Sequence, residues 1–285
     1  MLLALLLLAT PHMTYHGGKV LPAPRYYNLY WGFYWQDHPD QKQWFDGFTA
    51  AVAPSKELAS QVTEYSVNGQ QLGAGSFGGS FVAQENPAPT ITDADLVEFI
   101  HRQLEAKAVP QPDEHNVYAV FLAPGVKIQN EDKAVGYHGP TVYGFHQIMI
   151  HFDSYVLDVA SRDVAAVTYS HEMAETMTDP DLDAWFSDAD GSENGDVCEG
   201  RVGFAGGYTI QQEWSNAANS CMASRDVPLP PSGGTCPMGT HLEGSDCVGD
   251  LWNWGCSSTS GGFPAVFGLL ALALRFRTRR PTSGH

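Results

Sequence analysis

The chain has 285 residues, of which 43% are hydrophobic and 12% aromatic, enough for one sizeable core or for one core with a small appendage. Fifteen Lys and Arg against 32 Asp and Glu give a net charge of −17. This balance argues against binding to nucleic acid or to anionic lipid surfaces, and it favours either general solubility or the binding of cations.

Residues 1–14 resemble a signal peptide. The run MLLALLLLAT is apolar and too short to span a bilayer, and it has the length of the hydrophobic region of such a peptide. It lacks the basic residues that normally open one, and a hypothesis that follows is that the natural start codon lies upstream. We therefore expect an exported protein.

The first half of the expected globular domain (15–223) begins with an aromatic-rich strand over 26–35. Apolar residues at helical spacing predict a helix over 40–53, which ends before a proline. A strand is expected over 61–67. The glycine-rich stretch 68–81 is expected to be a loop, and it lacks the order of glycines that binds phosphate.

The second half of the domain alternates helices and strands. Helices are expected over 92–107 and 161–179, each with its first residue, a Thr or a Ser, as N-cap. Strands are expected over 115–124, 145–153 and 207–215. The alternation predicts an α/β (α+β) fold, a mixed sheet packed by helices.

The chain after this domain is predicted to be a linker and a tail. A Pro/Gly-rich linker with a small cysteine loop covers 224–255. In the tail, 256–285, Cys256 precedes an apolar stretch and a cluster of arginines, a pattern that resembles the C-terminal sorting signals of myxobacteria. The resemblance implies a hydrophobic sorting helix that is transiently in the membrane, cleavage and lipid attachment near Cys256, and display at the cell surface or outer membrane.

Five cysteines leave one unpaired if the others form disulfides, as expected in an exported chain. We predict the pairs Cys198–Cys221 and Cys236–Cys247, with Cys256 reserved for the sorting step. The first bridge closes a loop long enough to contribute roughly 3 kcal/mol of stability.

The segment SHEMAETMTDP resembles the zinc-protease motif H-E-x-x-H, with Glu175 where the second histidine would stand. Residues four apart on a helix lie one above the other, so we expect His171 and Glu175 to share a face that is buried against the sheet. A buried His and Glu need a partner, which is either a metal ion or a hydrogen bond between them. The motif therefore predicts a zincin-like helix or an internally bonded polar pair.

The segment that follows this helix is rich in Asp and Glu and has no Lys or Arg up to Glu199. Within it, Glu193 and Asp196 are the predicted third ligands. With His171, Glu175 and Asp196 around Zn²⁺, a fourth position stays open to water. Glu172 would then act as the general base of a hydrolase.

Two carboxylate ligands make Mn²⁺ or Ca²⁺ the alternatives to Zn²⁺. The opening of a calcium-binding EF-hand loop is matched by Asp190, Ser192, Asn194 and Gly195. Arg201 stands where the bidentate Glu of that loop is required, which excludes an ordinary EF-hand and leaves a looser calcium-binding turn as an alternative.

The other histidines of the second half are weaker ligand candidates. His138 stands in a GYHG segment, and His146 and His151 lie on opposite faces of one expected strand. We expect each to be a hydrogen-bonded core or surface residue.

Several blocks of sequence resemble the EXORDIUM-like, phosphate-induced proteins, in particular their bacterial branch. In chain order these blocks are YHGGKVL, YYNLYWGFYW, NVYAVFLAPGV, GYHG, AETMTDPDLDAWF and GDVCEG. They are scattered over residues 15–221. The resemblance implies an extracellular protein, linked in plants to growth and nutrient responses, without a settled biochemical activity.

Two hypotheses of function follow. In the first, the chain is an exported, surface-anchored metal-binding protein and a zinc-dependent hydrolase acting on extracellular peptides. In the second, it is a non-catalytic EXORDIUM-like module that binds an extracellular polymer or protein, with the aromatic segment 26–35 supplying contacts. Core packing is the preferred account of those aromatics.

Overall fold

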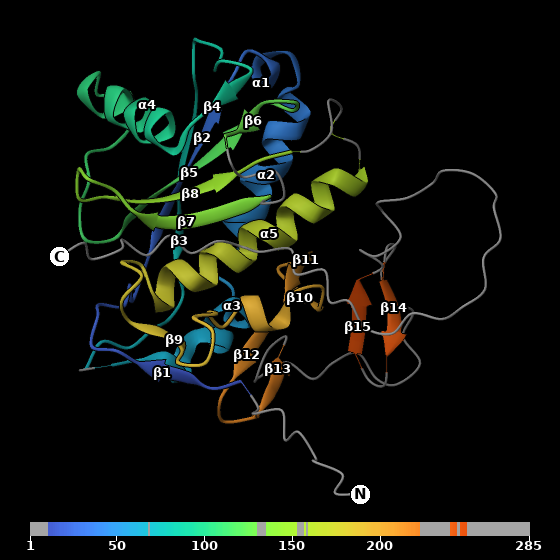
Figure 1. Ribbon diagram of the computed structural model, residues 1–285. Helices are drawn as coiled ribbons and strands as arrows, with labels where there is room; N and C mark the ends of the chain where they lie inside the picture. The colour runs from blue at the N-terminus through green and yellow to red at the C-terminus, as the bar shows by residue number, and fades with distance from the viewer. Residues whose placement is uncertain are drawn as a thin grey trace, which may run out of the picture.

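The centre of the molecule is a five-stranded mixed sheet with the order β3-β2-β5-β8-β7 (Figure 1). The computed structural model describes residues 11–67, 69–129, 135–152, 157, 159–222, 240–243 and 246–249. Four strands are parallel, and β7 at one edge runs antiparallel to β8. The strands of this sheet are β2 (Arg25–Trp31), β3 (Ser76–Val82), β5 (Asn116–Leu122), β7 (Gly136–Pro140) and β8 (His146–Ile150).

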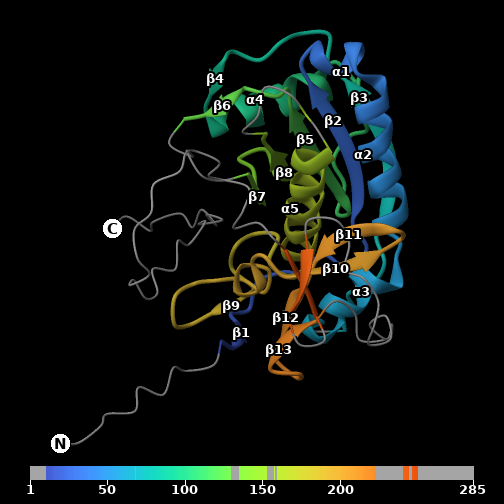
Figure 2. The same ribbon diagram turned by 90° about the vertical axis from the view of Figure 1, so that its right-hand side faces the viewer.

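Helices cover both faces of the sheet, which gives the predicted mixed sheet packed by helices. One face packs against α4 (Asp93–Glu105), and the other packs against α2 (Pro39–Val52) and α5 (Val159–Thr178), as Figures 1 and 2 show. Alternate residues of β5 point to the two faces. Phe121 joins the cluster with α2 and α5, and Val120 joins the cluster with α4.

The remaining short elements lie mostly below one end of α5 (Figures 1 and 2). Among the described residues, β1 pairs with β9, β4 with β6, β10 with β11, β12 with β13 and β14 with β15. Their bounds are α1 (Tyr34–Asp37), α3 (Lys56–Val62), η1 (Thr63–Tyr65), η2 (Asp196–Cys198), β1 (Met13–Tyr15), β4 (Thr90–Ile91), β6 (Lys127–Ile128), β9 (Trp185–Ser187), β10 (Val202–Ala205), β11 (Tyr208–Gln211), β12 (Glu213–Ser215), β13 (Ser220–Met222), β14 (Thr240–Glu243) and β15 (Asp246–Gly249).

The aromatic segment at the start of the domain is core, as preferred from the sequence. Tyr26 and Tyr30 are fully buried and Trp31 is 4% exposed. The strand ends at Trp31, earlier than predicted, because Gly32 adopts a positive φ of 129° and the chain then enters α1. The segment therefore does not offer the row of exposed aromatic side chains that binding to a partner would need.

Three of the predicted elements differ from the structure in kind. The expected strand 61–67 is the end of α3 followed by η1, because Ser55 caps α3 by accepting from the Leu58 N–H. The expected glycine-rich loop contains most of β3. The expected strand 207–215 is split into β11 and β12, which pair with different partners.

The two predicted helix caps have different outcomes. Thr92 caps α4, and its hydroxyl accepts from the Asp95 N–H in a capping box. Ser161 is not the cap of α5, which begins at Val159 and contains Ser161 in its first turn. A residue caps the N-terminus of a helix only if the residues before it are not helical. Here the two residues before Ser161 are already helical.

None of the helices in the described ranges is both long enough and apolar enough to cross a membrane. The apolar run of the predicted signal peptide and the whole sorting tail with Cys256 lie outside the described residues, as do most of the linker and Cys236. Export, sorting and the Cys236–Cys247 bridge therefore stay predictions.

Candidate metal centre

The second half of α5 is buried on every side. Every residue from Ala165 to Asp179 is buried, because the sheet covers one side of the helix and the loops and hairpins after it cover the other. An all-buried helix is normally apolar. This helix carries the carboxylates of Glu172 and Glu175, each 1% exposed, so two acidic side chains lie in the interior of the protein.

His171 and Glu175 lie side by side on α5, as their spacing predicts. His171 Nε2 is 3.1 Å from Glu175 Oε2, and His171 is fully buried. Glu172 Oε1 is also 3.9 Å from His171 Nε2. The motif thus brings one imidazole and two carboxylates together.

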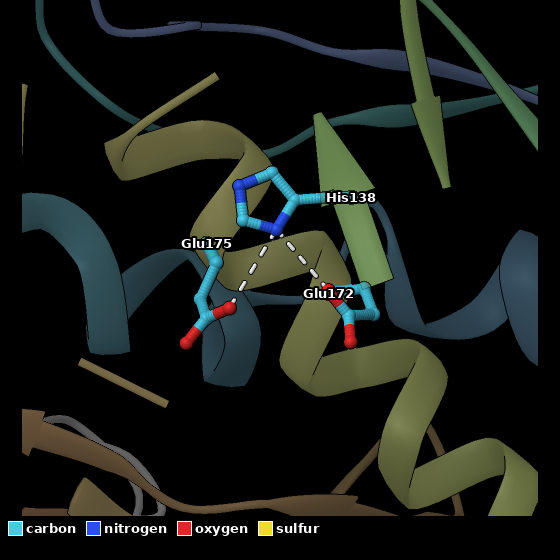
Figure 3. A group of neighbouring side chains, drawn as sticks. All are labelled: His138, Glu172 and Glu175. Carbon is cyan, nitrogen blue, oxygen red and sulfur yellow. Dashed lines mark hydrogen bonds and ion pairs between the residues drawn. The ribbon is translucent and has the colours of Figure 1, made fainter. Parts of the chain in front are cut away.

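His138 enters the same centre from β7. Its Nδ1 is 3.1 Å from Glu172 Oε2 and 3.6 Å from Glu175 Oε2 (Figure 3). Its Nε2 is 3.3 Å from the backbone oxygen of Asp179. The sequence had favoured a hydrogen-bonded core or surface role for His138. The structure confirms that His138 is a buried, hydrogen-bonded residue, and it adds that the ring lies beside both helix carboxylates.

One sequence signal for His138 is the glycine two residues before it. A Cβ at Gly136 would lie 2.5 Å from Thr168 Cγ2 and 3.2 Å from Glu172 Oε1. Only a residue without a side chain therefore lets β7 approach α5 this closely. His146, by contrast, pairs with Asp181 at 2.9 Å, outside this centre, which agrees with the prediction for it.

The loop after β9 brings both predicted third ligands to the centre. Asp196 Oδ1 is 3.9 Å from His171 Nε2, and the Asp196 N–H donates to Glu175 Oε1. Glu193 Oε1 is 3.7 Å from His138 Nε2. A Cβ at Gly195 would lie 2.6 Å from His171 Nδ1, so this glycine permits the loop to approach the helix.

A disulfide fixes the end of this loop. Cys198, the last residue of η2, is bonded to Cys221 in β13, as predicted. Because η2 begins at Asp196, the bridge ties the segment that contains Asp196 to β13. The loop therefore has a covalent anchor beside its ligand residue.

Two groups in the described residues could hold a metal ion. They are His138, Glu172 and Glu175, and His171, Glu175 and Asp196. Within each group the potential ligand atoms all lie within 4.8 Å of one another, and Glu175 belongs to both. Imidazole nitrogen with carboxylate oxygen is a donor set used by Zn²⁺, Mn²⁺ and Fe²⁺.

Glu193 is the least compensated carboxylate of the centre. It is fully buried, and neither of its oxygens accepts a hydrogen bond from the described part of the chain. Burying an ionised carboxylate without compensation is strongly unfavourable. Glu193 therefore needs either a proton or a cation.

Burial and mutual repulsion dominate the acid–base properties of the loop carboxylates. Burial raises the pKa of Glu193 well above its ordinary value, and Glu175 and Asp179 raise it further. Burial, with the charge of Glu175, raises the pKa of Asp196 to about 8. In the absence of a cation these carboxyl groups are therefore held as neutral acids at or near neutral pH.

The helix side chains behave as charged partners of the histidines. Burial opposes protonation of His171, yet the charges of Glu175 and Glu172 outweigh it and raise the His171 pKa well above its ordinary value. Burial raises the pKa of Glu172, whereas His171 outweighs burial at Glu175 and lowers its pKa. The centre therefore attracts positive charge of either kind, proton or metal.

The residues of the predicted calcium-binding turn lie in different environments. Asn194 is 1% exposed, and its Oδ1 accepts from Thr178 Oγ1 inside the protein. Asp190 is exposed and accepts from the Ser192 N–H. Two of the positions that such a turn requires are thus directed to different environments.

Comparison with known proteins gives no assignment: no protein-family model matches the sequence, and no curated protein is significantly similar to it. The likeness to EXORDIUM-like proteins therefore stays a prediction, and the function has to be argued from the candidate metal centre.

Proposed function

We propose that this is an exported protein that holds a divalent cation in the centre formed by α5, β7 and the Glu193–Asp196 loop. The observation that carries the proposal is the environment of His138. Its Nε2 donates to the Asp179 carbonyl, and its Nδ1 faces carboxylate oxygens of Glu172 and Glu175. The positive charge that compensates these two carboxylates is either a second proton on the ring or a metal ion bound by the three atoms.

The donor atoms favour a transition metal. Zn²⁺ accepts two carboxylates and an imidazole, and Mn²⁺ accepts the same set. Ca²⁺ prefers oxygen ligands alone, and the nitrogen of His138 makes it the weaker alternative. We therefore place Zn²⁺ first and Mn²⁺ second.

The burial of the ligands supports a structural role for the ion. His171, Glu172, Glu175 and Glu193 are each at most 1% exposed. An ion bound to them would tie the edge strand, the helix and the disulfide-anchored loop together. Such an ion adds its binding free energy to the stability of the fold.

The experiment is a measurement of bound metal. The full-length protein is stripped with a chelator, reloaded with Zn²⁺ or Mn²⁺, and analysed by mass spectrometry. Glu175→Ala, which removes the carboxylate common to both groups, should lose the metal, and His146→Ala should keep it because His146 pairs elsewhere. Wild-type protein that takes up neither metal would contradict the proposal.

A zinc-dependent hydrolase with a zincin-like α5 is the second candidate, and the exposure of Asp196 favours it. The Asp196 side chain is 16% exposed, so water can approach the centre on that side. Glu172, whose pKa is raised by burial, would be the general base. Glu172→Gln should then abolish hydrolysis of a mixed peptide substrate while metal stays bound. Wild-type protein without peptidase activity would leave only the structural role.

The disulfide supports the extracellular part of the proposal. Disulfides persist in oxidising compartments, and Cys198–Cys221 joins two segments of the domain. A peptide, polymer or protein partner outside the cell is consistent with that location. A non-catalytic EXORDIUM-like module would need a contact surface other than the 26–35 segment, whose large side chains are mostly buried.

A further inference from the structure

We propose that the centre binds two divalent cations, one at each histidine, with Glu175 as the shared ligand. This inference rests on the proposed function and specifies its stoichiometry. It assigns His138 and Glu172 to the first ion and His171 and Asp196 to the second.

The position of Glu175 is the first argument. Its Oε2 is 3.6 Å from His138 Nδ1 and 3.1 Å from His171 Nε2, so one oxygen faces both imidazoles. Its Oε1 accepts the Asp196 N–H, which fixes the orientation of the carboxylate. Ligand atoms around one ion at about 2.1 Å are about 3 to 3.5 Å apart, close to these separations.

Each histidine also has a carboxylate of its own. Glu172 Oε2 is 3.1 Å from His138 Nδ1, and Asp196 Oδ1 is 3.9 Å from His171 Nε2. Neither group of mutually close ligand atoms in the described chain contains both histidines. A single ion would therefore serve one histidine and leave the other facing carboxylates without a cation.

The negative charge of the centre also favours two ions over one. The ion pairs that Glu172, Glu175, Glu193 and Asp196 form within the described chain are all with the two histidines. With neutral imidazoles and all four carboxylates ionised, the centre carries four negative charges, which two divalent cations balance. With one ion, two of the carboxyl groups have to keep a proton.

The two positions should differ in affinity because the histidines are held differently. His138 already donates from Nε2 to a carbonyl, which leaves Nδ1 ready for a metal. His171 Nδ1 lies 2.6 Å from the side-chain nitrogen of Gln211, which also donates to the Gly195 carbonyl. With this orientation of Gln211, a neutral His171 ring accepts at Nδ1 and carries its proton on Nε2, so that proton must move and the Gln211 amide must turn before His171 ligates through Nε2.

The experiment is a titration of the chelator-stripped full-length protein with Mn²⁺, followed by metal counting and electron paramagnetic resonance. We expect two Mn²⁺ per chain, bound in two steps. Two ions that share a carboxylate oxygen are exchange-coupled, so the six-line signal of isolated Mn²⁺ should appear after the first step and be lost after the second. His138→Ala and His171→Ala should each retain one ion, and His146→Ala should retain two.

The outcomes separate this inference from the proposed function. One ion per chain in the wild type overturns the two-ion centre and leaves the metal-binding proposal standing. No ion overturns both. Two ions with an undiminished six-line signal overturn the sharing of Glu175. The wild-type measurement decides these cases even if a variant fails to fold.

Discussion

The two carboxylate oxygens of Glu175 make different contacts. One is held by the backbone of the loop and the other lies between two imidazoles. Burial alone would raise the pKa of this side chain, and the histidines lower it instead, so it is charged across the physiological range. Such a carboxylate is a ready ligand, because no proton has to leave before a metal binds.

Gly195 tests how closely the loop must approach the helix. In Gly195→Ala the new Cβ would lie 2.6 Å from His171 Nδ1 and 2.8 Å from Glu175 Oε1, so the loop must shift. We expect the affinity for the metal to fall by about tenfold or more, which corresponds to a loss of about 1.4 kcal/mol of binding free energy. Isothermal titration with Zn²⁺ measures the change.

Gly73→Ala is the matched control for this substitution, because a Cβ there meets no atom within 4 Å. It should bind Zn²⁺ as the wild type does. Equal affinity in the wild type and Gly195→Ala would show that the loop contact is not part of the metal centre.

Among the elements, β7 and η2 complete the set of potential ligands that α5 begins. The helix alone supplies His171, Glu172 and Glu175, while the edge strand adds His138 and the loop adds Asp196. The edge strand is held by pairing with β8, and the loop is held by the Cys198–Cys221 bridge. The centre is therefore a property of three elements from separate parts of the chain.

Removing the bridge should weaken stability and metal binding together. The double variant Cys198→Ser/Cys221→Ser releases a link across 23 positions of sequence, for which loop entropy gives about 3 kcal/mol of lost stability. Asp196 begins the helical turn that contains Cys198, so its carboxylate should also be less well positioned. Urea unfolding with and without Zn²⁺ measures both effects.

The change in the stabilisation by Zn²⁺ is the informative quantity in that experiment. A fall in stability with an unchanged increment from Zn²⁺ would show that the bridge supports the fold and not the centre.

For the whole molecule the buried acids predict an unusual dependence of stability on pH. The folded-state pKa of Asp196 is raised from 3.8 to about 8, and that of Glu193 is raised as well. A carboxyl group with a raised pKa favours folding in its protonated form, so its contribution is full below pH 4 and is lost as the pH rises towards about 8.

The metal-free protein should therefore melt at a lower temperature at pH 8 than at pH 5. A bound cation replaces the protons, so the difference in melting temperature between the metal-loaded and the metal-free protein should widen as the pH rises. Thermal unfolding in chelator and in excess Mn²⁺ at several pH values measures this. A difference that stays constant with pH would argue that these carboxylates do not meet the ion.

Much of the sheet and several helices could be predicted because their signals are local. The buried strand β5 and the capped helix α4 are specified by short patterns of apolar and capping residues. The segment 61–67 was mistaken for a strand because its residues suit both structures, and Ser55 together with packing selects the helix.

The sequence by itself determined that His171 and Glu175 share a helix face, since a spacing of four residues is a property of any α-helix. It also indicated the Cys198–Cys221 bridge. Only the tertiary structure brought His138 to the same carboxylates. That contact depends on β7 pairing antiparallel to β8 and on Gly136 allowing the strand to lie against α5. Contacts between distant segments are selected by packing of the whole fold, so a glycine such as Gly136 can permit the contact, but no local pattern specifies its partner.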